Sequence, residues 1–407
     1  MAVATVNPLA ESGKPLFFRV ADSGALGVAP PPIRLGEAVR LCVRSLDGMQ
    51  KEALVASART GAVWRLASDE GAYLAGLDEA PCPLSFLTTG MVSSYMTEIL
   101  AFARQRGVQI ERLRLVQDNY YTMVGSALKG TMTGGAKDVD LTAQIASPAD
   151  RDTLTQLVLD ATAASPLNGL LRGAHTSLFS LTHNGRALAP ARAQPLGRAA
   201  ERDPGTEFDR TAPASGDWSG LVRRGGPTPK TAHTVTLAGD SLAEQQSRLL
   251  HLRATCELRA DGVKEIEQHL YNPHGSIFRL LCDEAPANGG AGRAPDAASY
   301  VSAGIGFCFM TQFGRYAEIA KKRLDRYRIV QDTHFSLGGA SAGTGVPGTA
   351  APVETHVYLD TREDDDFART ALDMAEQTCF LHALCRTALK TRVSIRDYAD
   401  DAPPAEG

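Results

Sequence analysis

The sequence predicts an α+β protein made of two tandem copies of one domain. Three observations predict this. Segments recur at a constant spacing, strand-like segments come before and after one long helical segment in each half, and both long helices contain a glycine at the same position. Each half is therefore expected to fold as one domain around its long helix.

The repeat holds one spacing without gaps. The segment RLRLVQDNYY at 112–121 recurs as RYRIVQDTHF at 326–335, which is 214 residues later. At the same spacing, GAVWRLASDE at 61–70 recurs as GSIFRLLCDE at 275–284. Further identical pairs at this spacing are Gly90/Gly304, Thr97/Thr311, Gly125/Gly339, Arg172/Arg386 and Ser180/Ser394. An internal duplication accounts for these matches, with copies at 36–181 and 250–395.

The first part of each copy is expected to form strands and then a long helix. Strands are predicted at 37–46 and 62–67, and again at 251–258 and 276–281, with Asp-Gly pairs at Asp47-Gly48 and Asp261-Gly262 that favour hairpins. The long helices are predicted at 84–107 and 300–324. Gly90 and Gly304 lie inside them, where glycine costs about 1 kcal/mol against alanine, so we expect the two helices to cross closely.

The second part of each copy is expected to repeat the order strand, strand, helix, strand. Strands are predicted at 108–117 and 138–145, and at 326–337 and 353–360. A second helix is predicted to start at Ser147, and its counterpart at Thr361. Ser165, before Pro166, looks like another helix start, and Cys379 is its counterpart. Strands at 176–182 and 391–395 close the copies.

Composition and charge exclude several classes of function. The net charge is −4 and no basic cluster is present, so no nucleic-acid partner is expected. No signal sequence and no apolar run of bilayer length is present, so no membrane partner is expected either. Seven cysteines without regular spacing favour a reducing compartment, which predicts a cytoplasmic protein. No dinucleotide or phosphate-binding motif occurs, and no cofactor is predicted.

The sequence predicts three regions. The first half, 36–187, and the second half, 250–396, carry the two copies. Between them, 188–249 is rich in Pro, Gly, Ala and charged residues, which predicts a linker or insert rather than a third core.

The order of elements, the segment APDAASYVSAGIGFCFMT at 294–311, and a second cysteine about 70 residues later resemble the OsmC/Ohr family of thiol-dependent peroxidases. The resemblance covers most of both copies. It implies two OsmC-like domains that form a pseudo-dimer within one chain, with long central helices packed against antiparallel sheets. Whether such pseudo-dimers associate further stays open.

The resemblance assigns roles to two cysteines. Cys308 matches the peroxidatic cysteine in the long helix, and Cys379 matches the resolving cysteine at the start of a later helix. A thiolate that attacks a peroxide becomes a sulfenic acid, and a second thiol condenses with it to a disulfide. The first half has Ser94 and Ser165 at these positions, so its role is expected to be structural.

One feature of the family is missing from the sequence. The glutamate that precedes the peroxidatic cysteine by about ten residues corresponds to Ala298, and to Leu84 in the first half. Two arginines recur, Arg65 and Arg279, and we expect them to make structural pairs with Asp69 and Asp283.

The second half also collects histidines, at His334, His356 and His382. With Cys379 and Cys385 they raise the alternative of a zinc or iron site, or of a nucleophile and base pair for hydrolysis, although no compact ligand spacing is present. No metal ligand is assigned.

The function predicted is that of a cysteine-based peroxidase. A hydrophobic organic hydroperoxide is the substrate, Cys308 and Cys379 are the catalytic pair, and a dithiol is the reductant. Two alternatives stay open: a non-peroxidase enzyme that uses Cys308 as a nucleophile or a Cys/His metal site, and a small-molecule binding protein.

Overall fold

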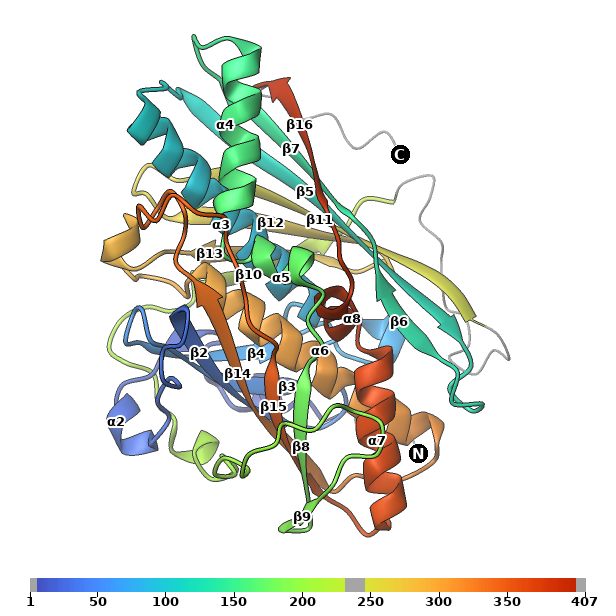
Figure 1. The fold of residues 1–407 in the computed structure, drawn as a ribbon. Helices are drawn as coiled ribbons and strands as arrows, with labels where there is room; N and C mark the ends of the chain where they lie inside the picture. Colours follow the sequence, from blue (N-terminus) through green and yellow to red (C-terminus); the bar gives the residue numbers. More distant parts are fainter. Residues whose placement is uncertain (1–5, 231–245, 400–407) are drawn as a thin grey trace.

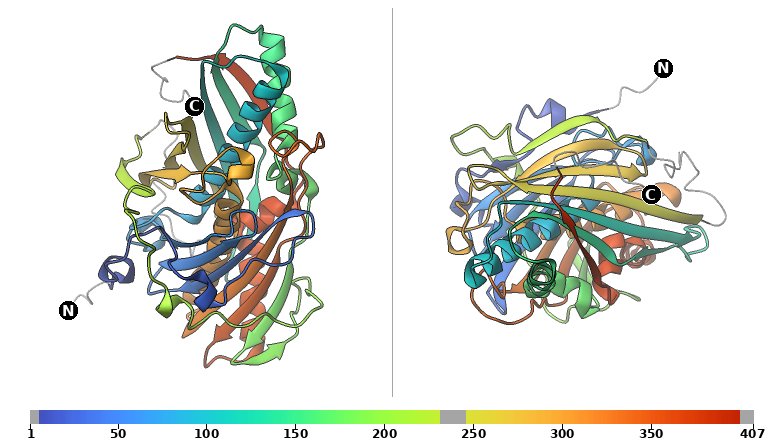
Figure 2. Two further views of the ribbon diagram at one scale, coloured as in Figure 1. Left: turned by 90° about the vertical axis from the view of Figure 1, so that its left-hand side faces the viewer. Right: turned by 90° about the horizontal axis from the view of Figure 1, so that it is seen from above.

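The protein is described by a computed structural model that covers residues 6–230 and 246–399. It is a mixed α+β fold with two large sheets, and the two long helices lie between them (Figure 1). Helix α3, Pro83–Arg106, packs on one sheet, and helix α6, Ala297–Ile319, packs on the other. The layers are therefore sheet, helix, helix, sheet (Figure 2).

Sheet 1 has the strand order β1-β4-β3-β2-β14-β15-β8-β9. Its strands are β1 (Phe18–Arg19), β2 (Gly36–Ser45), β3 (Lys51–Ser57), β4 (Val63–Ser68), β8 (Leu178–His183), β9 (Arg186–Leu188), β14 (Arg326–Ser336) and β15 (Glu354–Asp360).

Sheet 2 has the order β10-β13-β12-β11-β5-β7-β16, with β6 paired to β5. Its strands are β5 (Arg112–Gly125), β6 (Thr133–Ala136), β7 (Val139–Ala146), β10 (Val222–Pro227), β11 (Gln246–Leu258), β12 (Lys264–Asn272), β13 (Ser276–Cys282) and β16 (Thr391–Asp397).

The shorter helices lie at the ends of the strands. The α-helices are α1 (Pro8–Glu11), α2 (Ser23–Leu26), α4 (Arg151–Ala164), α5 (Asn168–Gly173), α7 (Asp365–Thr378) and α8 (Phe380–Arg386). Single 3₁₀ turns are η1 (Ala72–Leu74), η2 (Phe208–Arg210) and η3 (Pro286–Asn288).

Each sheet combines strands from both halves of the chain. In sheet 1, β2 of the first half pairs with β14 of the second, and in sheet 2, β11 of the second half pairs with β5 of the first. The strand order β4-β3-β2-β14-β15-β8 has the same pattern as β13-β12-β11-β5-β7-β16, with the halves exchanged. The halves are therefore interleaved rather than folded as separate domains.

The expectation of antiparallel sheets is wrong for one pairing in each sheet. Strand β15 runs parallel to β8, and β7 runs parallel to β16. The reason is the interleaving, because the last strand of each half joins the sheet of the other half instead of turning back on its own neighbour.

The two long helices cross at their glycines. A Cβ on Gly90 would lie 2.4 Å from the carbonyl oxygen of Ala297, and a Cβ on Gly304 would lie 2.7 Å from the backbone nitrogen of Leu87. No Cβ fits at either distance, so the missing side chains allow the two backbones to touch. This is the close crossing that the sequence predicts.

Helix ends follow local capping signals, with one correction. Gly107 ends α3 in a left-handed conformation, as its position predicts. The second helix of each half starts later than predicted, after Asp150 and Asp364 rather than at Ser147 and Thr361. Each aspartate accepts a hydrogen bond from the backbone amide three residues on, and this is a stronger cap than the serine or threonine before it.

The segment predicted as a linker is partly packed against sheet 1. Phe208 is fully buried in a cluster with Phe18, Cys42 and Tyr358 on the outer face of this sheet. Strand β10 extends sheet 2 by pairing with β13. Apolar residues in the segment supply this packing, so 189–227 is an insert with its own contacts, while 231–245 lie outside the described residues.

Among the helices of the described residues, none combines the length and apolar character that a bilayer crossing requires.

The crossing of α3 and α6 leads to a stability prediction. Gly90→Ala and Gly304→Ala should each lower the free energy of unfolding by about 1–3 kcal/mol, because the added methyl group meets backbone atoms that cannot move aside. Urea unfolding followed by circular dichroism measures this. Gly226→Ala is the control, since a Cβ there has no atom within 4 Å. Equal urea midpoints for all three variants would contradict the close crossing.

Candidate active site

Cys308 and Cys379 come from different elements and meet in the interior. Cys308 lies in the middle of α6, and Cys379 is the residue between α7 and α8. The backbone of Cys379 is extended, which ends α7 and starts α8 as the sequence predicts. Its sulfur accepts a hydrogen bond from the backbone amide of His382 at 3.5 Å.

The two thiols are buried and hydrogen-bonded to each other. Cys308 is 2% exposed and Cys379 is fully buried. Their counterparts in the first half make the same contact, because the hydroxyl oxygens of Ser94 and Ser165 are 2.8 Å apart. All seven cysteines of the chain are free thiols. The structure therefore brings the two predicted site residues together in the reduced state.

Burial decides the protonation state of Cys308. It raises the pKa of this thiol well above its usual value, and the hydrogen bond with Cys379 raises the pKa further. A hydrogen bond from the backbone amide of Leu381 at the start of α8 acts in the opposite direction. Cys308 is consequently a neutral thiol at neutral pH.

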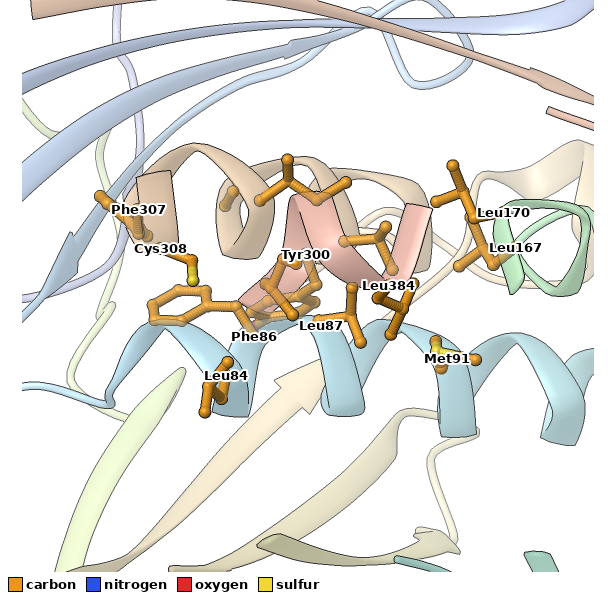
Figure 3. Packing of buried hydrophobic residues seen from close by; sticks show 14 of the residues in the cluster. Leu84, Phe86, Leu87, Met91, Leu167, Leu170, Tyr300, Phe307, Cys308 and Leu384 are labelled. Carbon is orange, nitrogen blue, oxygen red and sulfur yellow. The ribbon is translucent and has the colours of Figure 1, made fainter. Parts of the chain in front are cut away.

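A pocket reaches Cys308 from the surface, and residues of both halves line it. The first half contributes Glu70, Tyr73, Cys82, Leu84 and Met123. The second half contributes, besides Cys308, Leu270, Thr311, Gln312, Arg315 and Phe380, and Arg248 and Leu250 lie at its boundary with the insert. Figure 3 shows the Cys308 side chain directed toward the ring of Phe86 on α3, near Leu84.

Residues 289–394, which contain both cysteines, match the family model described as OsmC-like protein. This segment is an OsmC-like domain. The first half has no such match, so the duplication stays a prediction.

One solved structure was found for comparison, an OsmC-like hydroperoxide resistance protein from Jannaschia sp. CCS1. It is 24% identical, and the alignment covers 33% of this chain and 85% of that chain. The TM-score of 0.21 is too low for this likeness to carry an argument. No curated protein matches the chain.

Beside the OsmC-like domain, the first half supplies an acidic residue that sequence reasoning missed. The carboxylate of Glu70 accepts hydrogen bonds from the hydroxyls of Thr311 at 3.0 Å and Tyr73 at 2.8 Å. Burial raises the pKa of Glu70, and the charge of Lys51 opposes this. The recurrence of Glu70 as Glu284 at the repeat spacing was the available signal.

The equivalent site of the first half is built differently. Lys264 makes an ion pair of 2.8 Å with Glu284 and donates a hydrogen bond to Thr97 at 2.6 Å. Ser94 and Glu98 line this site. It holds hydroxyl and carboxyl groups where the Cys308 pocket holds thiols, so it cannot form a disulfide.

The two positions of the missing glutamate face the opposite sites from the ones their halves suggest. Ala298 of the OsmC-like domain lines the site of Ser94, whereas Leu84 of the first half lines the Cys308 pocket. The crossing of α3 and α6 exchanges them, because the start of each helix lies beside the middle of the other. The acidic group of the Cys308 pocket is Glu70.

The pairing expected for the two recurring arginines is wrong. Arg65 makes an ion pair of 2.8 Å with Glu52, and Arg279 makes one of 2.7 Å with Glu267. The partners lie on neighbouring strands, β3 and β12, which bring side chains of one sheet face within reach. Asp69 instead accepts hydrogen bonds from the backbone amides of 70, 77 and 79, and Asp283 accepts those of 291 and 293.

The three histidines of the OsmC-like domain do not converge. His382 shares a hydrogen bond of 2.7 Å with Ser177, His356 one of 2.7 Å with Ser180, and His334 accepts one from Arg34 at 3.1 Å. Burial lowers the pKa of His382 to about 3 and that of His356 to about 4. Within 6–230 and 246–399, no three His, Cys, Asp or Glu side chains are placed to hold one metal ion.

The remaining cysteines have separate surroundings. Cys42 lies on the outer face of sheet 1, whereas Cys256 lies in the main core, although they occupy matching strands. The sulfur of Cys282 accepts a hydrogen bond from Ser93 at 2.9 Å. Cys385 is buried in α8, and burial raises its pKa to about 12. Cys82 lines the Cys308 pocket, which nothing in the sequence indicated.

The raised pKa predicts how the reactivity of Cys308 depends on pH. Only the thiolate is a nucleophile, and its fraction grows about tenfold per pH unit below the pKa. The alkylation rate of Cys308 by iodoacetamide, followed by peptide mass spectrometry, should rise by about this factor per unit from pH 6 to pH 9. A rate that levels off near pH 6 would contradict the neutral thiol.

Proposed function

We propose that the protein is a thiol-dependent peroxidase that reduces organic hydroperoxides through Cys308 and Cys379. The observation that carries the proposal is the hydrogen-bonded thiol pair at the end of a pocket. Support also comes from the match of residues 289–394 to the OsmC-like family.

The chemistry proceeds in three balanced steps. The sulfur of Cys308 attacks the outer oxygen of the hydroperoxide, the O–O bond breaks, and the products are a sulfenic acid and an alcohol. The thiol of Cys379 then attacks the sulfenic sulfur, which forms a disulfide and releases water. A dithiol reductant attacks the disulfide, restores both thiols and is itself oxidised to a disulfide.

The first step needs the proton of Cys308 to move to the departing alkoxide. Glu70 is the acidic group in the pocket, and its raised pKa suits a carboxyl that accepts and returns a proton near neutral pH. The apolar residues of the pocket, Leu84, Met123, Leu270 and Phe380, suit the hydrophobic part of a hydroperoxide. The cycle needs a reducing compartment, in line with the cytoplasmic location predicted from the cysteine pattern.

We also propose that the chain is a pseudo-dimer of two OsmC-like domains with one active half. The shared strand order of the two sheets and the crossing of two equivalent helices support this. The first half then has two roles. It completes both sheets, and it supplies Glu70, Tyr73 and Leu84 to the pocket of the second half.

Titration of thiols tests the peroxidase. With excess cumene hydroperoxide, the wild type should lose two thiols per chain and form the Cys308–Cys379 disulfide. Cys379→Ser should instead form a sulfenic acid at Cys308, which dimedone traps, and Cys308→Ser should lose neither thiol. Quantitation with a thiol reagent and peptide mass spectrometry measure these outcomes.

Cys42→Ala is the matched control, because Cys42 is buried on the outer face of sheet 1, on the opposite side from the pocket. It should respond to peroxide like the wild type. Wild-type protein that keeps Cys308 and Cys379 as free thiols under excess hydroperoxide would refute the peroxidase and favour a binding protein or a different use of Cys308.

A further inference from the structure

The Cys308 pocket contains a buried arginine that the peroxidase steps do not use. Arg315 lies seven residues after Cys308 on α6, which is two helical turns, so both side chains are on one face of the helix. Arg315 is 6% exposed and lines the pocket together with Cys308. Its backbone is roughly 10 Å from that of Cys308 along the helix axis.

The guanidinium of Arg315 is left without the partners that its burial requires. Its Nε and Nη2 atoms are buried and have no hydrogen-bond partner within the described parts of the chain, 6–230 and 246–399. Arg65 is similarly buried, yet it donates to Glu52 and to the carbonyl oxygens of Pro15 and Leu16. A buried charge without such partners is costly, so a ligand with acceptor atoms would remove a penalty.

The guanidinium keeps its charge at neutral pH. Burial lowers its pKa to about 10, the charge of Arg248 lowers it further, and the charge of Glu70 opposes both. Arg248 lines the same pocket, so two cationic side chains face one space. An anionic ligand would relieve both the burial of Arg315 and the repulsion between the two arginines.

The cation occurs in the cysteine-bearing pocket and has no counterpart in the equivalent site. The residue 214 positions before Arg315 is Ala101, and the one before Gln312 is Glu98. Glu98 lines the site of Ser94 and accepts hydrogen bonds from the backbone amides of Ala340 and Ser341. The two pockets therefore differ in charge as well as in thiols, as expected if Arg315 serves the ligand of the Cys308 pocket.

We propose that Arg315, with Arg248 beside it, binds a carboxylate group of the ligand that enters the Cys308 pocket. The planar guanidinium offers two parallel N–H donors, which match a carboxylate. Resting on the proposed peroxidase, the substrate is then a hydroperoxide with a carboxylate at the end remote from the O–O bond. Leu84, Leu270 and Phe380 contact the apolar chain between the two ends.

Direct binding tests the proposal without any peroxide chemistry. Calorimetric titration of the reduced wild type with hexanoate and with hexan-1-ol compares a carboxylate with a neutral ligand of similar size. Hexanoate should bind at least tenfold more tightly, because charge-assisted hydrogen bonds are about twice as strong as neutral ones. Equal binding of the two ligands, or no binding of hexanoate, would overturn the carboxylate site, and neither result depends on a variant.

Variants then assign the preference to Arg315. Arg315→Gln should bind hexanoate and hexan-1-ol equally, and Arg315→Lys should keep part of the preference because it keeps the charge but not the two parallel donors. Arg279→Gln is the control, since Arg279 is exposed on sheet 2 and pairs with Glu267. An undiminished preference in Arg315→Gln would show that another group binds the carboxylate.

The outcome is separable from that of the peroxidase test. Carboxylate binding with inert thiols would leave the site and remove the peroxidase, whereas thiol oxidation without a carboxylate preference would do the reverse.

Discussion

The contact of two helix backbones at Gly90 and Gly304 is the constraint on which the rest of the structure depends. Side chains normally keep helix axes 8–10 Å apart, and removing two of them lets α3 and α6 touch. The start of α3 then lies beside the middle of α6, which brings Leu84 to the Cys308 pocket. The same contact holds the two sheets at a distance that lets each accept strands from the other half.

This arrangement makes the candidate site a product of both halves. Cys308 and Cys379 belong to the second half, but Glu70 and the apolar wall around Leu84 belong to the first. A half without cysteines is therefore retained for its packing and for the groups it lends. The serine pair at 94 and 165 keeps the geometry of the thiol pair while removing its redox chemistry.

The spacing of the repeat shows where sequence comparison reaches its limit. Most elements match at 214 residues, yet the register of β2 on β14 and of β11 on β5 makes Cys42 the counterpart of Thr255. A shift of one residue moves a side chain to the other face of a strand. This is why Cys42 and Cys256 have different surroundings, and why Lys51 corresponds to Lys264 at 213 residues rather than 214.

The sequence by itself determined the order of elements, the long helices with their glycines and the identity of the cysteine pair, because periodicity, capping and turn chemistry are local. Only the tertiary structure decided that the halves interleave, that Glu70 rather than the residue at 298 is the acid near Cys308, and that Arg315 is buried without a partner. Those facts depend on contacts between residues more than 200 positions apart. Their geometry follows from packing, which no local pattern encodes.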